Sequence, residues 1–168
     1  MAFDPIILEI LNNKIAAAAD EMCSTLQRAS RSTFVKEAAD FGVGISAPAG
    51  YCFGYPPAHS IQYLMDSNWG PTLRKFPNLE PGDVIVTNDP YRSEGLVTHL
   101  PDLYMARPYF WGRRIACFGW AIIHFTDVGG RVPSSISPSN HEIFQEGIIF
   151  PPMKIVRRGV LSQDFVTV

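Results

Sequence analysis

Residues 103–125 read LYMARPYFWGRRIACFGWAIIHF, and this stretch decides the fold. Two runs rich in β-branched and aromatic residues flank the tripeptide Trp-Gly-Arg at 111–113, which has the composition of a turn. The second run is almost continuously apolar from Ile115 to Ile123, as in a strand that is covered on both faces. The sequence therefore predicts two long strands joined by a short turn.

The segments on either side of these strands complete an α+β pattern. Asp4 and Pro5 have the form of a helix N-cap followed by proline at the first helical position, and apolar residues then recur at helical spacing to about Arg28. Residues 59–76 can be helical in part, with a break near 68–70. Further strands are predicted at residues 41–46, 51–53, 84–87 and 154–156. We expect one domain of residues 1–168, in which the N-terminal helix packs on a mixed or largely antiparallel sheet; a partner helix is the alternative.

The composition is that of an ordinary globular protein. Of 168 residues, 46% are hydrophobic and 18% are charged, and the formal net charge is −2. This charge gives no basic surface for nucleic acid or an anionic membrane, and no apolar run approaches the roughly 18 to 20 residues of a membrane span. Cys23, Cys52 and Cys117 stand among apolar residues, which favours buried thiols in a reducing compartment over a disulfide framework. We expect a cytoplasmic protein without nucleic-acid or membrane partners.

One short pattern occurs twice beside the predicted strand pair. His99-Leu-Pro-Asp102 precedes the pair and His124-Phe-Thr-Asp127 follows it, so in each case a histidine stands three residues before an aspartate. Imidazole and carboxylate groups held together at neighbouring strand ends suit a divalent metal. We therefore expect His99, Asp102 and His124 to be metal ligands. The alternative for His124 is a core histidine at the end of an apolar strand.

Other acidic and polar residues lie at the ends of predicted elements. Glu37 and Asp40 come just before the run at 41–46, where a carboxylate can be a ligand, although a surface charge or a cap is the alternative. Residues 88–90, Asn-Asp-Pro, are either a tight turn or part of a polar rim. Glu142 and Glu146 are four residues apart, so a helical turn would place both carboxylates on one face.

Five motifs, taken together, resemble one known family. They are Asn88-Asp-Pro-Tyr91, Thr98-His-Leu-Pro-Asp102, His124-x-x-Asp127-Val-Gly-Gly130, Glu142-Ile-Phe-Gln-Glu-Gly147 and Pro151-Pro152-x-Lys154 with Arg158-Gly159. In this order and spacing they look like the hydantoinase B/oxoprolinase family, which includes the metal-bearing subunits of N-methylhydantoinases, caprolactamases, and acetone and acetophenone carboxylases. Chains of that family are several times longer, so the resemblance covers only their N-terminal part. The sequence is either a fragment or a natural small subunit.

The resemblance implies the metal-bearing part of an ATP-dependent enzyme subunit. The enzyme would be a hydrolase of cyclic amides such as hydantoin, a lactam or oxoproline, or a ketone carboxylase, and its substrate would be a small molecule. The implied partners are a hydantoinase A-type subunit that uses ATP and the remaining hydantoinase B-type polypeptide. The competing interpretation is a non-catalytic structural or assembly subunit of such a complex, and a stand-alone metallohydrolase is the third.

The resemblance also implies roles for the acidic residues. A further metal ligand comes from the segment 36–40, with Asp40 favoured and Glu37 the close second, and Zn²⁺, Mn²⁺ or Fe²⁺ would suit these nitrogen and oxygen ligands. Asp127 and Glu142 or Glu146 would act in catalysis by orienting the ligands or carrying protons. The chain departs from the family pattern in a longer loop at 92–97 and in Phe125, where a second histidine is common. These two differences imply a different substrate.

Overall fold

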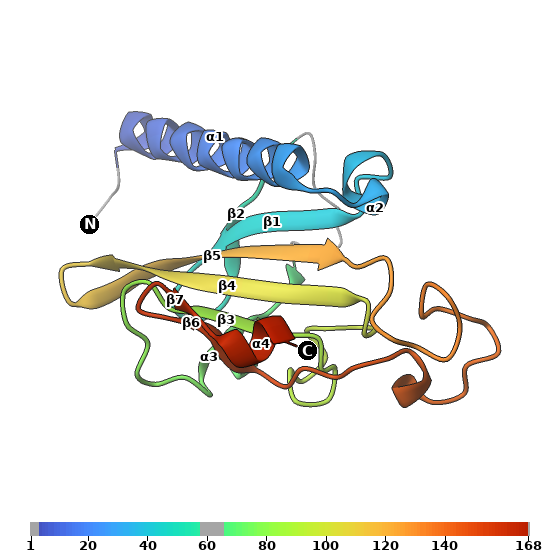
Figure 1. Ribbon diagram of the computed structural model, residues 1–168. Coiled ribbons are helices and arrows are strands. Elements are labelled where there is room, and N and C mark those ends of the chain that lie inside the picture. Colours follow the sequence, from blue (N-terminus) through green and yellow to red (C-terminus); the bar gives the residue numbers. More distant parts are fainter. Residues whose placement is uncertain (1–3, 58–65, 168) are drawn as a thin grey trace.

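The structure is a computed structural model that describes residues 4–57 and 66–167. One long helix, α1 (Pro5–Ala29), lies along one face of a seven-stranded sheet (Figure 1). Asp4 caps this helix by accepting a hydrogen bond from the backbone N–H of Ile6, and Pro5 occupies the first turn. Every strand pair in the described part of the chain is antiparallel. The predicted α+β fold, with its N-terminal helix on a largely antiparallel sheet, is confirmed.

The sheet has the strand order β2-β1-β5-β4-β3-β6-β7. Its strands are β1 (Phe41–Ser46), β2 (Cys52–Gly54), β3 (Val84–Thr87), β4 (Asp102–Trp111), β5 (Arg114–His124), β6 (Met153–Arg157) and β7 (Val160–Leu161). The predicted strand pair is the central hairpin of β4 and β5, which turns at Gly112 with a positive φ of 59°.

The register of this hairpin decides which side chains meet at its open end. Asp102, the first residue of β4, is the Cα partner of His124, the last residue of β5, and the pairing continues to Trp111 and Arg114. Because side chains alternate between the two faces of a strand, partners directly opposite each other point to the same face. The hairpin therefore places the Asp102 and His124 side chains next to each other.

Apolar side chains pack on both faces of the sheet. Under α1 the cluster contains Cys23 from the helix together with Phe41 and Val43 from β1. The opposite face carries a larger cluster, in which the ring centroids of Trp69 and Trp120 are 6.1 Å apart. The central strand β5 is thus covered on both faces, as its almost continuous apolar run predicts.

Short helices complete the chain. They are α2 (Thr33–Lys36), α3 (Gly70–Leu73), the 3₁₀ turn η2 (Ile143–Gln145) and α4 (Gln163–Thr167). The helical segment predicted within residues 59–76 falls partly on residues 58–65, outside the described residues, and its described part contains α3. Residues 33–36 form a helix where the sequence suggested only a polar connection. Within the residues that the structure describes, no helix has the length and apolar character needed to cross a membrane.

Candidate metal centre

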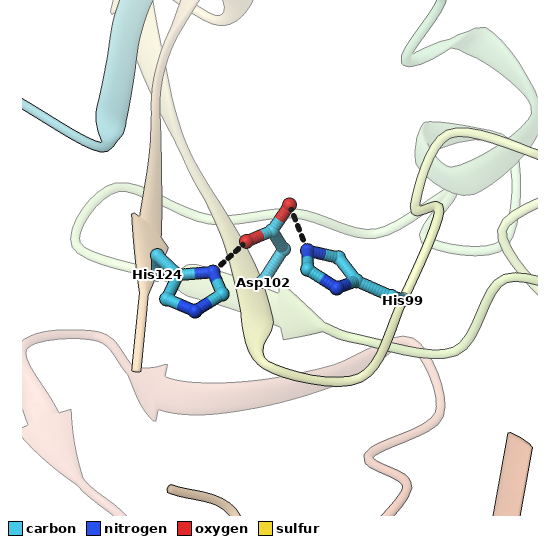
Figure 2. A group of neighbouring side chains, drawn as sticks. All are labelled: His99, Asp102 and His124. Carbon is cyan, nitrogen blue, oxygen red and sulfur yellow. Dashed lines mark hydrogen bonds and ion pairs between the residues drawn. The ribbon is translucent and has the colours of Figure 1, made fainter. Parts of the chain in front are cut away.

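His99, Asp102 and His124 come together at the open end of the central hairpin (Figure 2). The Asp102 carboxylate lies between the two rings, with Oδ2 at 3.0 Å from Nε2 of His99 and Oδ1 at 2.9 Å from Nδ1 of His124. One possible ligand atom from each residue lies within 4.8 Å of the others. The structure thus brings together the three residues that the sequence singled out.

The backbone holds each of these residues by a different route. Asp102 and His124 are fixed by the β4–β5 ladder, and the backbone N–H of Phe125 extends it by donating to the carbonyl of Pro101 at 2.8 Å. His99 lies in the turn before β4, where its carbonyl accepts from the backbone N–H of Asp102 at 3.3 Å. The His-x-x-Asp spacing is therefore a tight turn that folds the His99 ring back onto the Asp102 carboxylate.

Burial and charge make this a polarised group. Asp102 and His124 are buried, whereas the His99 side chain is 28% exposed. The hydrogen bond to Asp102 raises the pKa of His99 more than burial lowers it, and the charges of Asp102, Glu146 and Asp40 act in the same direction. Burial alone would raise the pKa of Asp102, but hydrogen bonds and charges from His99 and then His124 outweigh burial and lower that pKa. The centre thus favours the ionised form of the Asp102 carboxylate beside the His99 imidazole.

This donor set fits a divalent cation. Two imidazoles and one carboxylate are ligands that Zn²⁺, Mn²⁺ and Fe²⁺ share, and the partly exposed His99 keeps one side of the group open to solvent. The same atoms can instead share protons in a hydrogen-bonded His–Asp–His group. Metal binding has to be tested against this second interpretation.

Asp40 is the acidic residue of the segment 36–40 that lies beside the cluster. Its Oδ2 is 3.7 Å from Nδ1 of His124, and its backbone carbonyl accepts from the His124 N–H at 3.3 Å. The positive φ of Ala39, 54°, turns the chain between α2 and β1. Glu37 is exposed at the C-terminal end of α2. The geometry places Asp40 near the cluster and leaves Glu37 on the surface, while the ligand role of each stays a prediction.

Asp127 is exposed and organises its own loop. Its carboxylate accepts hydrogen bonds from the backbone N–H groups of Gly129 at 2.8 Å and Ser134 at 3.1 Å, and from the Ser135 hydroxyl at 3.1 Å. These bonds, that from Gly129 first, lower the pKa of Asp127. The second His-x-x-Asp pattern therefore contributes its histidine to the cluster, whereas its aspartate turns to the loop.

Glu142 and Glu146 flank the 3₁₀ turn η2 and differ in their contacts. Glu142 belongs to a capping box with Gln145 at the start of that turn. Glu146 Oε2 accepts from the backbone N–H of Leu100 at 2.9 Å, in the turn between His99 and Asp102. Of the three residues with a predicted catalytic role, Glu146 is the one whose contacts reach the cluster.

Two further residues lie around the cluster: the sequence did not indicate Phe34, and it left Asn88 open between a tight turn and a polar rim. The Phe34 ring packs against His124, with ring centroids 4.9 Å apart, and nothing in the sequence pointed to this contact. Asn88 is fully buried and its amide contacts Leu100. The sequence signal for Asn88 is its place at the end of an apolar strand, where a polar side chain can be buried and hydrogen-bonded.

A large groove among the described residues lies away from the cluster. It lies between α1 and the sheet, has a volume of about 680 Å³ and is lined mostly by apolar side chains such as Leu26, Val43 and Ile45. A polar pocket of about 370 Å³ includes Thr98 and Tyr104. Thr98 precedes His99, and Tyr104 follows Asp102 by two residues on the same face of β4. This polar pocket is the better candidate for a small substrate.

The sequence profile of the family described as hydantoinase B/oxoprolinase matches residues 4–168. The 5-oxoprolinase PfmaA of Pestalotiopsis fici is 34% identical over 164 residues, which are 96% of this chain and 12% of that protein. The caprolactamase subunit beta of Pseudomonas jessenii is 27% identical over 172 residues, or 97% of this chain and 28% of that protein. The chain therefore spans about an eighth to just over a quarter of these relatives.

Two solved structures share the fold. The ATP-dependent caprolactamase from Pseudomonas jessenii superimposes with a TM-score of 0.80 and 27% identity, over 99% of this chain and 29% of that chain. A nucleotide-free acetone carboxylase superimposes with a TM-score of 0.84 and 17% identity, over 98% of this chain and 22% of that chain. At the latter identity the likeness concerns the fold alone.

Proposed function

The chain belongs to the hydantoinase B/oxoprolinase family, and on this premise we propose that it is the metal-bearing N-terminal part of a subunit of an ATP-dependent enzyme. The reaction is hydrolysis of a cyclic amide such as a hydantoin, a lactam or oxoproline, or carboxylation of a ketone. ATP is used by a hydantoinase A-type partner subunit, and the remaining hydantoinase B-type polypeptide completes the complex. Residues 1–168 act in it as one domain.

The cluster of His99, Asp102 and His124 is the observation that carries this proposal. Two imidazoles and a carboxylate that the fold holds within 4.8 Å, with Asp102 and His124 buried, are a ready set of metal ligands. Asp40 supplies a further carboxylate, because its Oδ2 already lies 3.7 Å from His124. Zn²⁺, Mn²⁺ and Fe²⁺ all suit these ligands.

Different residues of the chain would have different roles in this reaction. When bound, the divalent metal polarises a substrate carbonyl or lowers the pKa of a bound water. Glu146 holds the turn that carries His99, and the polar pocket beside Thr98 and Tyr104 receives the small substrate. Asp127 and Glu142 keep their predicted catalytic roles only if the complete complex brings them to the cluster.

The proposal places the protein in the cytoplasm as part of a hetero-oligomer. Free thiols at Cys52 and Cys117 suit a reducing compartment. The relative named caprolactamase subunit beta is by its name one subunit of an assembly. A second candidate function, a non-catalytic assembly subunit, is favoured by one observation, the exposed apolar side chains along the first half of α1.

Elemental analysis of the purified protein tests the metal centre. We expect about one metal ion per chain in the parent and almost none in a His99→Ala, His124→Ala variant, because removing both imidazoles leaves only the carboxylates of Asp102 and Asp40. His141→Ala is the matched control, since His141 is an exposed histidine outside the cluster. Equal metal content in the parent and the double variant would contradict the proposal.

The partner subunit separates the two candidate functions. If the chain is catalytic, ATP-dependent turnover appears when a hydantoinase A-type subunit is added, and the double variant abolishes it. Firm association with the larger subunits, with no metal in the parent and no effect of the double variant, would favour the assembly role.

A further inference from the structure

Asn88 follows β3 directly, and its side chain is fully buried. The amide Nδ2 donates to the carbonyls of Leu100 at 2.8 Å and Ile148 at 2.9 Å, and Oδ1 accepts from the backbone N–H of Phe150 at 2.6 Å. Both donor hydrogens of the amide, as well as its oxygen, are thus used. The three partners belong to two segments, the turn that carries His99 and the stretch that follows Glu146.

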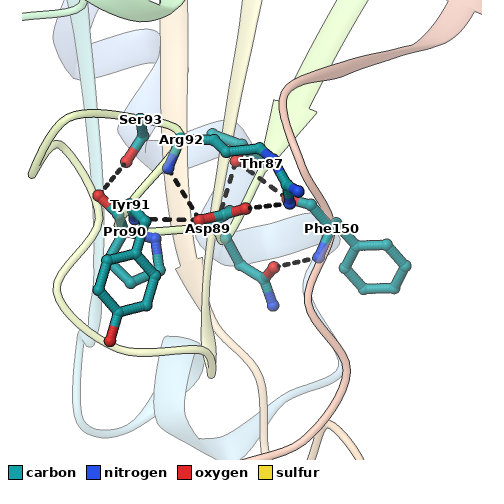
Figure 3. A network of polar contacts seen from close by, with 8 residues as sticks. Thr87, Asp89, Pro90, Tyr91, Arg92, Ser93 and Phe150 are labelled. Carbon is teal, nitrogen blue, oxygen red and sulfur yellow. Dashed lines mark hydrogen bonds and ion pairs between the residues drawn. The ribbon is translucent and has the colours of Figure 1, made fainter. Parts of the chain in front are cut away.

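The backbone around Asn88 is itself held rigidly. Figure 3 shows the end of β3 beside Phe150, whose carbonyl accepts from the Thr87 hydroxyl at 3.0 Å. The buried Asp89 carboxylate accepts from the backbone N–H groups of Tyr91 and Arg92 and from the Arg92 guanidinium. Asn88 therefore extends from a fixed platform, so its amide can hold other segments in place.

Leu100 is the residue through which this platform reaches the metal centre. It stands between His99 and Asp102, and side chains hold both of its backbone polar groups. The Asn88 amide donates to the Leu100 carbonyl at 2.8 Å, and the Glu146 carboxylate accepts from the Leu100 N–H at 2.9 Å. The peptide groups on the two sides of Leu100 cannot rotate without losing one of these buried hydrogen bonds.

We propose that Asn88 is a positioning residue of the metal centre: its amide fixes the Leu100 carbonyl, and thereby sets the distance between the His99 ring and the Asp102 carboxylate. The inference rests on the proposed function, because it assigns Asn88 to the same centre. Asn88 touches neither ring of the cluster, so it acts through the backbone of the turn. An aspartate has nearly the same shape, but when ionised it only accepts hydrogen bonds and donates none.

Asn88→Asp tests this role. The variant places carboxylate oxygens against the carbonyls of Leu100 and Ile148, and we expect Zn²⁺ and Co²⁺ affinity, measured by chelator competition, to fall about tenfold or more. The absorption spectrum of the Co²⁺-bound variant should also differ from that of the Co²⁺-bound parent. Asn140→Asp is the matched control, because Asn140 donates to the Ser135 carbonyl at 3.0 Å in another loop. Its affinity should stay within about twofold of the parent.

Other outcomes separate the positioning role from the proposed function. A folded Asn88→Asp variant with parental affinity and spectrum overturns the positioning role alone. If Asn88→Asp does not fold, Asn88→Ala is compared in its place, and failure of both to fold also overturns the proposal, because Asn88 would then support the sheet as a whole.

A parent protein that binds no metal overturns the proposed function. The positioning role is then measured in the metal-free protein by the NMR signal of the His99 Nε2–H, which faces Asp102 Oδ2 at 3.0 Å. A signal present in the parent and in Asn140→Asp but lost in Asn88→Asp supports the role, and a signal retained in Asn88→Asp overturns it.

Discussion

Asp40 and Glu37 are three residues apart in the chain, but their carboxylates lie in different surroundings. Asp40 immediately precedes β1, and β1 pairs with β5 in the sheet. This pairing places Oδ2 of Asp40 3.7 Å from Nδ1 of His124. Glu37 ends α2 and points to the surface. The family resemblance implied them as first and second choices for one ligand position, because both match acidic positions of the family's pattern. Only the pairing of β1 with β5 distinguishes them.

The first prediction concerns this pair. Asp40→Asn should weaken metal binding about tenfold, because an amide replaces a charged oxygen ligand at the edge of the cluster. Glu37→Gln makes the same chemical change three residues earlier and should leave affinity within about twofold. Chelator competition with Zn²⁺ measures both. The assignment of Asp40 fails if the two variants bind alike.

Asp83 and Lys154 form a buried ion pair. Lys154 Nζ donates to Asp83 Oδ2 at 2.6 Å, and the side chains are 16% and 1% exposed. Burial alone would raise the pKa of Asp83, but the hydrogen bond from Lys154 and the backbone N–H groups of Arg158 and Glu80 lower it. This pair joins the start of β3 to β6, at the end of the sheet away from the metal centre.

The second prediction is a pH-dependent loss of stability in Lys154→Met. At pH 7 the variant leaves the buried Asp83 carboxylate without its cation and should lose about 3 kcal/mol of unfolding free energy. The folded-state pKa of Asp83 is lowered, so its contribution is complete above the unfolded value of about 3.9 and is lost as the pH falls through the folded-state pKa. The difference between variant and parent should therefore shrink below about pH 4.

Urea unfolding at pH 7 and pH 3 measures this difference. Lys75→Met is the control, since Lys75 lies 3.6 Å from Glu94 in an exposed pair whose side chains are 40% and 55% exposed. Such a surface pair should change stability by less than about 1 kcal/mol at either pH. A Lys154→Met cost that persists at pH 3 would point to lost packing of the lysine stem instead of charge.

Among the elements, β1 and β5 pack tightly at a glycine. Gly44 pairs with Trp120, and a Cβ at position 44 would overlap the indole ring and lie 3.0 Å from the carbonyl of Gly54. Trp120 is 2% exposed and packs against Trp69, so its ring has no room to move away. Gly119 is the neighbouring strand glycine, but a Cβ there would meet only the side-chain ends of Tyr109 and Met22.

The third prediction compares these two glycines. Gly44→Ala should destabilise the protein by about 2 kcal/mol, because the added methyl overpacks a rigid part of the sheet. Gly119→Ala should stay within about 0.5 kcal/mol of the parent, since flexible side chains yield and the loss of glycine reduces the entropy of the unfolded chain. Urea midpoints measure both, and equal midpoints would show that the Trp120 ring adjusts freely.

Local sequence signals predicted the elements that are long and periodic. The apolar runs of β4 and β5 and the capped α1 were foreseen because periodicity and caps are local. The meeting of Asp102 and His124 did not follow from the short turn alone, because a register shift between Tyr109 and Phe110 moves the pairing by one residue. Without this shift Asp102 would pair with Ile123, and the two side chains would not meet. The helix α2 was missed because four residues carry no measurable periodicity.

The sequence could not foresee contacts that depend on strand order. The Asn88 amide meets Ile148 and Phe150, which are 60 and 62 residues away in the chain, only because β3 pairs with β6. The same applies to Glu146 and Leu100, which are 46 residues apart. The family resemblance implied a catalytic role for Asp127 beside the cluster, but the chain leaves the sheet after His124 and the carboxylate caps its own loop.

For the molecule as a whole, α1 carries a long row of exposed apolar side chains. Apolar residues in its first half are about half or more exposed, namely Ile6, Ile7, Leu8, Ile10 and Leu11. Burial begins only in the second half, at Ala19 and Cys23. The groove of about 680 Å³ between the helix and the sheet adds further apolar surface. Surface of this extent on one element favours association with another chain or segment.

The last prediction follows from this surface. In sedimentation equilibrium the parent should show an average mass that rises above 18.7 kDa with concentration, because water is released when these apolar side chains meet a second copy. Ile7→Gln with Leu11→Gln, two residues on one helix face, should weaken association roughly tenfold or more.

The control replaces equally exposed apolar residues elsewhere. Ile136→Gln with Val160→Gln changes side chains that are 49% and 71% exposed, in a loop and in β7, the edge strand farthest from β2 in the sheet order. If α1 is the associating element, this variant should self-associate like the parent. Because Ile7 and Leu11 are half-exposed already, their replacement should leave the thermal midpoint nearly unchanged, which separates lost association from lost folding. A parent that stays monomeric at every concentration would show that this apolar surface does not drive self-association.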